Sequence, residues 1–107
     1  MALDHIVVSL PATTKTALFT VPKGVPQCHV TIQNRDTAAS LAIGDDTLSA
    51  LSGANGGIYI PAAASSSAPN TFQMWMNGGD TIYGFAGAAA TNTVVILYSY
   101  VQTGSAS

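Results

Sequence analysis

Short runs of β-forming residues, each ended by a cluster of turn residues, recur along almost the whole 107-residue chain. Runs rich in Val, Ile, Thr, Tyr and Phe are typical of strands, and little of the chain shows the apolar spacing of a helix. The runs that predict strands are residues 6–10, 16–21, 28–34, 41–43, 58–60, 71–76, 81–86 and 93–101. About eight short strands predict an all-β domain, a single antiparallel β-sandwich that is jelly-roll-like by strand count.

Two of these runs predict which side chains share a face of a strand. In residues 28–34, Cys28 alternates with Val30 and Ile32 on one face, which makes Cys28 a buried small hydrophobe rather than a reactive thiol. The last run is apolar on both faces, as expected of a central strand or of one covered by a neighbouring subunit.

The segments between the runs give further expectations. The turn at residues 77–80, with its Asn-Gly step, predicts a tight hairpin between the runs on either side. Residues 47–52 could form one helical turn, and the Ala/Ser stretch at 62–68 predicts an exposed, mobile loop. We treat residues 1–107 as one domain, with 1–10 as an N-terminal arm or edge strand and 102–107 as a flexible tail.

Charged residues are unusually scarce. They make up 7% of the chain, against about 25% in ordinary domains, and Glu is absent. Either Thr, Ser, Asn and Gln keep the surface soluble, or part of it is buried against other protein chains, which we favour. Three basic residues are too few for a phosphate-tracking patch, so we expect no nucleic-acid partner. No apolar run approaches the ~20 residues that cross a bilayer, and the N-terminus does not resemble a signal peptide, so we expect no membrane partner and synthesis in the cytoplasm.

The sequence offers little from which to build a catalytic or metal site. The only histidines are His5 and His29, and no G-x-S-x-G elbow is present. We therefore predict that the protein is not an enzyme and has no catalytic residues, cofactor or metal. Asp45 and Asp46, with Asp36 nearby, could be read as a calcium site, but Gly-Asp-Asp is also ordinary turn chemistry, which we favour.

Trp75 is the single tryptophan and allows two interpretations. It could pack in the core, which we favour because an indole buries a large area in a small domain. If exposed with Tyr59, Tyr83 or Tyr98, it could instead stack on a sugar or anchor a protein interface. The residues we select as a candidate interface are Ile6, Val7, Val8, Trp75, Tyr98 and Tyr100.

The succession of short motifs resembles a known class of protein. A V-x-I-x-N strand from Val30 to Asn34 precedes an L-x-I-G strand from Leu41, a G-I-x-I strand from Gly57 and G-D-x-I-Y from Gly79. This order, over residues 28–101, resembles the small β-sandwich virion proteins of tailed bacteriophages, the capsid decoration and minor structural proteins. The Ala/Ser loop and the two runs before Cys28 depart from the pattern, which leaves open which position in the virion is occupied.

The resemblance implies a capsid decoration (cement) protein. Such a protein binds the major capsid protein of the phage head, often as a trimer, and stabilises the lattice without turnover. It implies a homo-oligomer, with a trimer favoured, and a virion location after synthesis in the host cytoplasm. The alternatives are a tail or minor tail protein, and a carbohydrate- or receptor-binding β-sandwich module.

Overall fold

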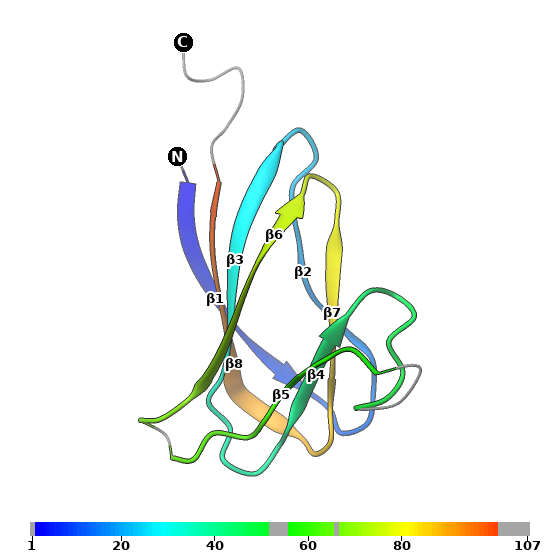
Figure 1. The fold of residues 1–107 in the computed structure, drawn as a ribbon, viewed down its shortest axis with the longest axis vertical. Coiled ribbons are helices and arrows are strands. Elements are labelled where there is room, and N and C mark those ends of the chain that lie inside the picture. Colours follow the sequence, from blue (N-terminus) through cyan, green and yellow to red (C-terminus); the bar gives the residue numbers. More distant parts are fainter. Residues whose placement is uncertain (1, 52–55, 66, 101–107) are drawn as a thin grey trace.

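The computed structural model describes residues 2–51, 56–65 and 67–100, which form two stacked antiparallel sheets (Figure 1). The strands are β1 (Ala2–Leu10), β2 (Thr16–Thr20), β3 (Gln27–Asn34), β4 (Leu41–Gly44), β5 (Ile58–Ile60), β6 (Asn70–Asn77), β7 (Thr81–Ala86) and β8 (Ala90–Tyr100). The predicted all-β sandwich is confirmed. Within these ranges no helix is long and apolar enough to cross a bilayer.

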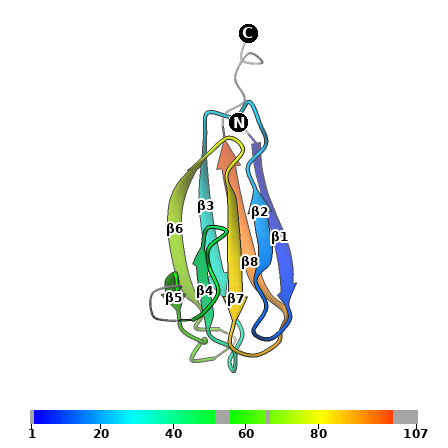
Figure 2. The same ribbon diagram turned by 90° about the vertical axis from the view of Figure 1, so that its right-hand side faces the viewer.

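The order of the strands is that of a jelly roll. One sheet, here called sheet A, has the order β1-β8-β3-β6, and the other, sheet B, has the order β2-β7-β4-β5. Strand pairs are nested: β1 pairs with β8, β2 with β7, β3 with β6 and β4 with β5. A long hairpin folded over itself gives this arrangement. Figure 2 looks onto sheet B with sheet A behind it.

The core lies between the sheets and is filled by alternate side chains of each strand. The prediction for β3 is confirmed, because Cys28, Val30 and Ile32 are all fully buried. Burial also raises the pKa of the Cys28 thiol, as expected for an inert packed cysteine. Gly84 in β7 leaves room for the core, since a Cβ there would lie 2.9 Å from a Leu18 methyl.

Asn34 is the one buried polar side chain among the described residues. Its Nδ2 donates to the carbonyl of Ala39 at 3.0 Å and to that of Pro61 at 3.2 Å, while its Oδ1 accepts from the Asp36 N–H at 3.1 Å. These bonds tie the end of β3, in sheet A, to the segments that enter β4 and leave β5, in sheet B. The sequence analysis placed Asn34 at the end of a strand and gave it no structural role.

The N-terminal segment is an edge strand. Residues Ala2–Leu10 form β1, which pairs with β8 from Ala2 opposite Tyr100 to Leu10 opposite Ala90. Leu10 is buried, and Ile6 and Val8 pack against the core. Strand β8 lies between β1 and β3, so the interpretation of the last run as a central strand is confirmed.

The predicted hairpin between residues 71–76 and 81–86 is wrong, because β6 and β7 lie in different sheets. A tight turn does form: the Asp80 N–H donates to the Asn77 carbonyl at 3.0 Å, and Gly79 has a φ of +89°. Only the second central residue has positive φ, which is the type II pattern. Hairpins favour the mirror-image types, so this turn carries the chain across to the other sheet.

Two smaller expectations also need correction. The described part of residues 47–52 contains no helical turn; instead Leu48 N–H donates to the Asp45 carbonyl at 3.1 Å. The Ala/Ser stretch is not wholly exposed, because Ala63 is buried and its N–H donates to the Asp36 carbonyl. The predicted tail at 102–107 lies outside the described residues.

Replacing Asn34 with alanine tests its role in joining the sheets. Asn34→Ala leaves buried carbonyls without donors, so we expect the free energy of unfolding to fall by about 2–3 kcal/mol in urea denaturation. Gln33→Ala, one residue earlier on the outer face, is the control and should change it by less than about 0.5 kcal/mol. Equal effects of the two substitutions would contradict the role of Asn34.

Candidate protein-binding surface

The outer face of sheet A is a broad four-stranded surface, and antiparallel register places its side chains in three rows across β1, β8, β3 and β6. The rows are Leu3, Ser99, His29 and Trp75; His5, Leu97, Thr31 and Gln73; and Val7, Val95, Gln33 and Thr71. None of these side chains is a lysine, arginine, aspartate or glutamate. We call this set the outer face of sheet A.

Large apolar side chains are exposed on this face. Leu3 is 67% exposed, Val7 50%, Leu97 43% and Trp75 65%. They come from β1, β8 and β6, so the apolar groups span the width of the sheet. Aromatic residues without neighbouring charges are typical of the centres of protein interfaces.

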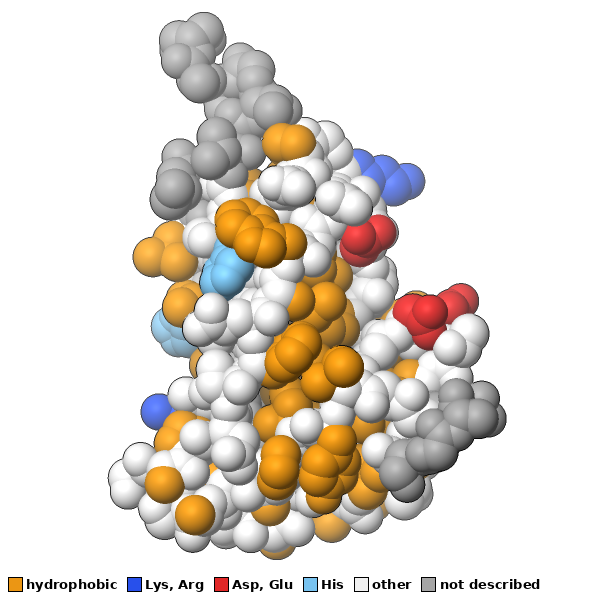
Figure 3. Space-filling view, in the orientation of Figure 1, with side chains coloured by type: hydrophobic (Ala, Val, Ile, Leu, Met, Phe, Trp, Pro, Cys, Tyr) orange, Lys and Arg blue, Asp and Glu red, His pale blue; other side chains and the backbone are white. Residues whose placement is uncertain are grey.

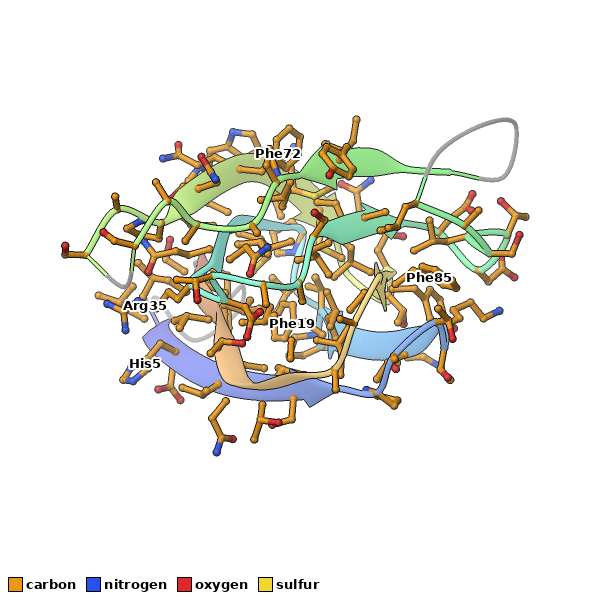
Figure 4. All side chains as sticks on the ribbon, turned by 90° about the horizontal axis from the view of Figure 1, so that it is seen from below. His5, Phe19, Arg35, Phe72 and Phe85 are labelled. Atoms are coloured by element: carbon orange, nitrogen blue, oxygen red, sulfur yellow. The ribbon has the colours of Figure 1, made fainter. Side chains whose placement is uncertain are left out.

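The charged residues lie almost entirely outside the strands. Of the three basic and five acidic residues, Asp4 alone is inside a strand, and it lies on the same face of β1 as the inward-facing Ile6 and Val8. Arg35 immediately follows β3 and lies on the outer side of the molecule, as does His5 (Figure 4). The outer face of sheet A is thus bounded by charge at one end but carries none within its strands.

Trp75 is exposed, so the favoured prediction that it packs in the core is wrong. Its position in β6 is opposite His29 of β3, and the two rings meet edge to face with centroids 4.9 Å apart. The residues alternating with it, Met74 and Met76, turn inward instead and take the core positions. The alternation along β6 therefore decides which of these three large side chains is buried.

The six candidate interface residues divide between the two faces of sheet A. Val7 and Trp75 lie on the outer face and are exposed. The other four, Ile6, Val8, Tyr98 and Tyr100, are partly buried against the core. Tyr98 stacks on Phe19 of sheet B with ring centroids 4.4 Å apart, and Figure 4 shows Phe19 in the interior between the sheets.

An apolar groove runs along the inner side of β6, where the two sheets part. It has a volume of about 420 Å³ and is lined by Ile43, Gly44, Asp45, Ile58, Phe72, Met74, Trp75, Met76, Asp80, Thr81 and Ile82. Figure 3 shows hydrophobic side chains gathered in a band along this side of the molecule. Trp75 contributes to the groove and to the outer face of sheet A, so the two surfaces meet along β6.

The aspartates considered for calcium make local turn bonds. The Asp45 carboxylate accepts from the N–H and the hydroxyl of Thr47, and these bonds lower its pKa. The Asp36 carboxylate accepts from the N–H groups of Ala38 and Ala39 and from the Thr93 hydroxyl, and the bond from Ala39 lowers its pKa most. In the described part of the chain, no three His, Cys, Asp or Glu residues gather as metal ligands.

The two histidines are not brought together. His5 in β1 and His29 in β3 both lie on the outer face of sheet A, with β8 between their strands. The two histidines lie in adjacent rows of this face. Neither takes part in a side-chain hydrogen bond with a described serine. The geometry offers a flat polar–apolar surface rather than a pocket with a positioned base.

The sequence analysis missed Leu3 and Leu97 as surface residues. Leu97 lies in a run that is apolar on both faces, so alternation alone cannot say which side is covered. The register could have supplied the answer: Leu97 pairs with Thr31, which lies opposite the buried side of β3. The period of β3 was visible in the sequence, but its pairing with β8 was not.

Comparison of the chain with models of protein families, with curated proteins and with solved structures finds no match.

Replacing Trp75 with alanine tests its position outside the core. We expect Trp75→Ala to change the free energy of unfolding by less than about 1 kcal/mol, because an exposed side chain contributes little packing. Ile32→Ala, at a fully buried site in the neighbouring strand, should cost about 2–4 kcal/mol in the same urea titration. A cost at Trp75 as large as that at Ile32 would show that the indole is a core group.

The lowered pKa of Asp36 predicts that this residue contributes to the loss of stability in acid. Its pKa in the folded chain lies below the ordinary value of 3.8, so its ionised form stabilises the fold above that pH. This stabilisation is lost as the pH falls through the folded-state pKa. Asp36→Asn should be less stable at neutral pH and lose less of its melting temperature on acidification below about pH 4. If the melting temperatures of the unchanged chain and of Asp36→Asn fell equally with pH, Asp36 would not be a source of the acid sensitivity.

Proposed function

We propose that this chain is a structural protein of a tailed-phage virion, a capsid decoration protein that binds the head lattice through the outer face of sheet A. The observation that carries the proposal is the absence of Lys, Arg, Asp and Glu from that face together with its exposed Leu3, Val7, Leu97 and Trp75. Such a surface is suited to lasting contact with protein, because little charge has to be desolvated when it is covered.

The distribution of charge supports a protein partner over a nucleic acid. The basic residues Lys15, Lys23 and Arg35 lie in separate connections between strands and form no stripe along a sheet. Lys15 is also engaged locally: its ammonium donates to the Asp46 carbonyl at 2.7 Å and lies 5.1 Å from the centre of the Tyr83 ring. The partner we propose is the major capsid protein.

The proposal assigns no catalytic step to the protein. Its work is the area that it buries across neighbouring capsid subunits, as the resemblance to decoration proteins implies. A homo-oligomer would multiply that area, and the trimer implied by the resemblance stays a prediction. The tail or minor tail alternative uses the same face with a different partner.

A second function, carbohydrate or receptor binding, is favoured by one observation. The exposed indole of Trp75 borders a groove that also has Asp45 and Asp80 on its lining. An aromatic ring beside carboxylates can hold a sugar by stacking and by hydrogen bonds to its hydroxyls. This function predicts that Trp75→Ala abolishes binding to a glycan array while substitutions at Leu97 leave binding unchanged.

Co-sedimentation with phage heads lacking this protein tests the leading proposal. Leu97→Lys adds a charge at the centre of the outer face, in a central strand, and we expect it to weaken binding at least about tenfold. Ala17→Lys adds the same charge at an exposed position of β2, in sheet B, and should bind as the unchanged protein does.

The following co-sedimentation results would count against the proposal. Equal binding by the two lysine variants would remove the outer face of sheet A from the contact. Binding to purified tails but not to heads would favour the tail alternative, and binding to neither would overturn the assignment to the virion.

A further inference from the structure

We infer that strand β6 is the self-association edge of this protein, and that two copies pair antiparallel through it about a two-fold axis at Gln73. This contact joins copies of the same chain. It goes beyond the proposed function, which concerns the outer face of sheet A and a capsid partner.

The direction of the main-chain groups of β6 follows from the register. Arg35 N–H donates to the Thr93 carbonyl at 2.8 Å, which makes the odd-numbered residues of β3 the ones that bond to β8. The even-numbered residues of β3 therefore bond to β6, at Phe72, Met74 and Met76. The N–H and C=O groups of Thr71, Gln73 and Trp75 consequently point away from the sheet, toward the open edge.

The ends of β6 are closed by side chains. The Asn77 N–H, which also points to the open edge, donates to the Asp80 carboxylate at 3.0 Å. At the other end Pro69 has no N–H, and Asn70 Nδ2 ties the start of β6 to the carbonyls of Pro61 and Ala62, both at 3.1 Å. The part of the edge that remains open is thus the stretch from Thr71 to Trp75.

The opposite edge of sheet A is protected. By the same alternation Leu3, His5 and Val7 of β1 point their main-chain groups outward, but the Asp4 carboxylate accepts from the His5 N–H at 2.8 Å. A charged side chain beside an edge strand discourages the addition of another strand. Strand β6 contains no charged residue and no proline, and the Asp80 carboxylate lies only at its Asn77 end, so the stretch from Thr71 to Trp75 lacks this protection.

The edges of sheet B are shorter. Strand β5 has three residues and is followed by Pro61, while β2 has five residues and an irregular register between Ala17 and Phe19. Short and irregular edges are poor templates for pairing. Among the described strands, β6 is therefore the long, regular, uncharged edge.

A second copy matches this edge. With Gln73 opposite Gln73 of the second copy, Thr71 lies opposite Trp75 and Trp75 opposite Thr71, which gives three hydrogen-bonded pairs and about six main-chain hydrogen bonds. Shifting the second copy toward one end of β6 brings in Asn77, whose N–H is already bonded to Asp80. Shifting it toward the other end brings in Pro69, which has no N–H. Either shift leaves fewer complete hydrogen-bonded pairs. The self-pairing centred on Gln73 makes the fullest use of the open groups.

The inward side chains also match. In this register Phe72 of each copy lies opposite Met74 of the other. These are non-hydrogen-bonded pairs, in which the facing side chains lie closest together. A methionine sulfur beside an aromatic ring is a favourable contact. These side chains lie at the apolar groove, whose other wall includes Ile58, which is half exposed in the single chain. The second copy would cover the open side of the groove.

The paired copies form one sheet in the order β1-β8-β3-β6-β6-β3-β8-β1. The uncharged outer face of sheet A then continues across both copies. A single-strand contact lies near the small end of specific interfaces, about 1,200 Å² in total, so we expect a dissociation constant on the order of micromolar.

Charged substitutions at Gln73, the residue on the two-fold axis, test the pairing. Sedimentation equilibrium of the unchanged chain at about 100 µM should give the mass of a dimer. Gln73→Lys and Gln73→Glu should each give a monomer, because each places two like charges opposite one another across the axis. An equal mixture of the two variants should recover the dimer, since unlike charges then meet.

Gln33 provides the matched control. It is the same residue type on the same face, one strand further from the edge. Gln33→Lys and Gln33→Glu should each remain dimeric, and circular dichroism should show that all four variants keep the β fold. The dimer stands in place of the trimer that the resemblance implies, so a trimeric or monomeric unchanged chain would overturn the inference. Variants at Gln73 whose mixture stays monomeric would overturn it too.

The outcome is separable from that of the proposed function. Leu97→Lys is directed at the capsid contact and should leave the dimer mass unchanged, because Leu97 lies in a central strand. A dimer that does not bind heads would refute the proposed function alone. A monomer that binds heads would refute the β6 pairing alone.

Discussion

The antiparallel pairing of β1 with β8 is the contact that closes this fold. It joins the two ends of the described chain, with Ala2 opposite Tyr100, and every other strand pair is nested inside it. Through it Ile6 and Val8 reach the core, and Leu3 and Val7 join the outer face of sheet A. Without this pairing β8 would become an edge strand. The N-terminal segment thus completes the sandwich and forms one margin of the proposed contact surface.

The alternation of side chains across sheet A divides them into a set that packs in the core and a set that forms the proposed contact surface. Cys28, Val30 and Ile32 of β3 face the core, while His29 turns outward to meet Trp75. The same alternation along β6 gives the core Met76 and gives the surface an indole. Because all the charged residues except Asp4 lie in the connections, the outward set combines apolar side chains with polar ones and contains no Lys, Arg, Asp or Glu. The few charged residues of this domain are thus concentrated in the connections between strands.

The strands could be predicted from the sequence because their signal is local. The alternation in residues 28–34 is a property of the strand itself, and the Gly, Pro and Asn clusters end each run. Pairing is not local, which explains the failures. The turn at Gly78 and Gly79 looked like a hairpin, yet its type II geometry sends β7 into the other sheet. Trp75 looked like a core residue by size, but its partner His29 faces outward. Asn34 is a turn-forming residue by type, and only the approach of Ala39 and Pro61 makes it a buried bridge.

The central claim is that the outer face of sheet A is the surface that meets the capsid. A cryo-electron microscopy reconstruction of phage heads carrying this protein measures it most directly. The account predicts density for the jelly roll outside the shell, with sheet A turned toward the major capsid protein and Leu97 covered by it. Density with sheet B or the loops against the shell, and the outer face of sheet A open to solvent, would contradict the account.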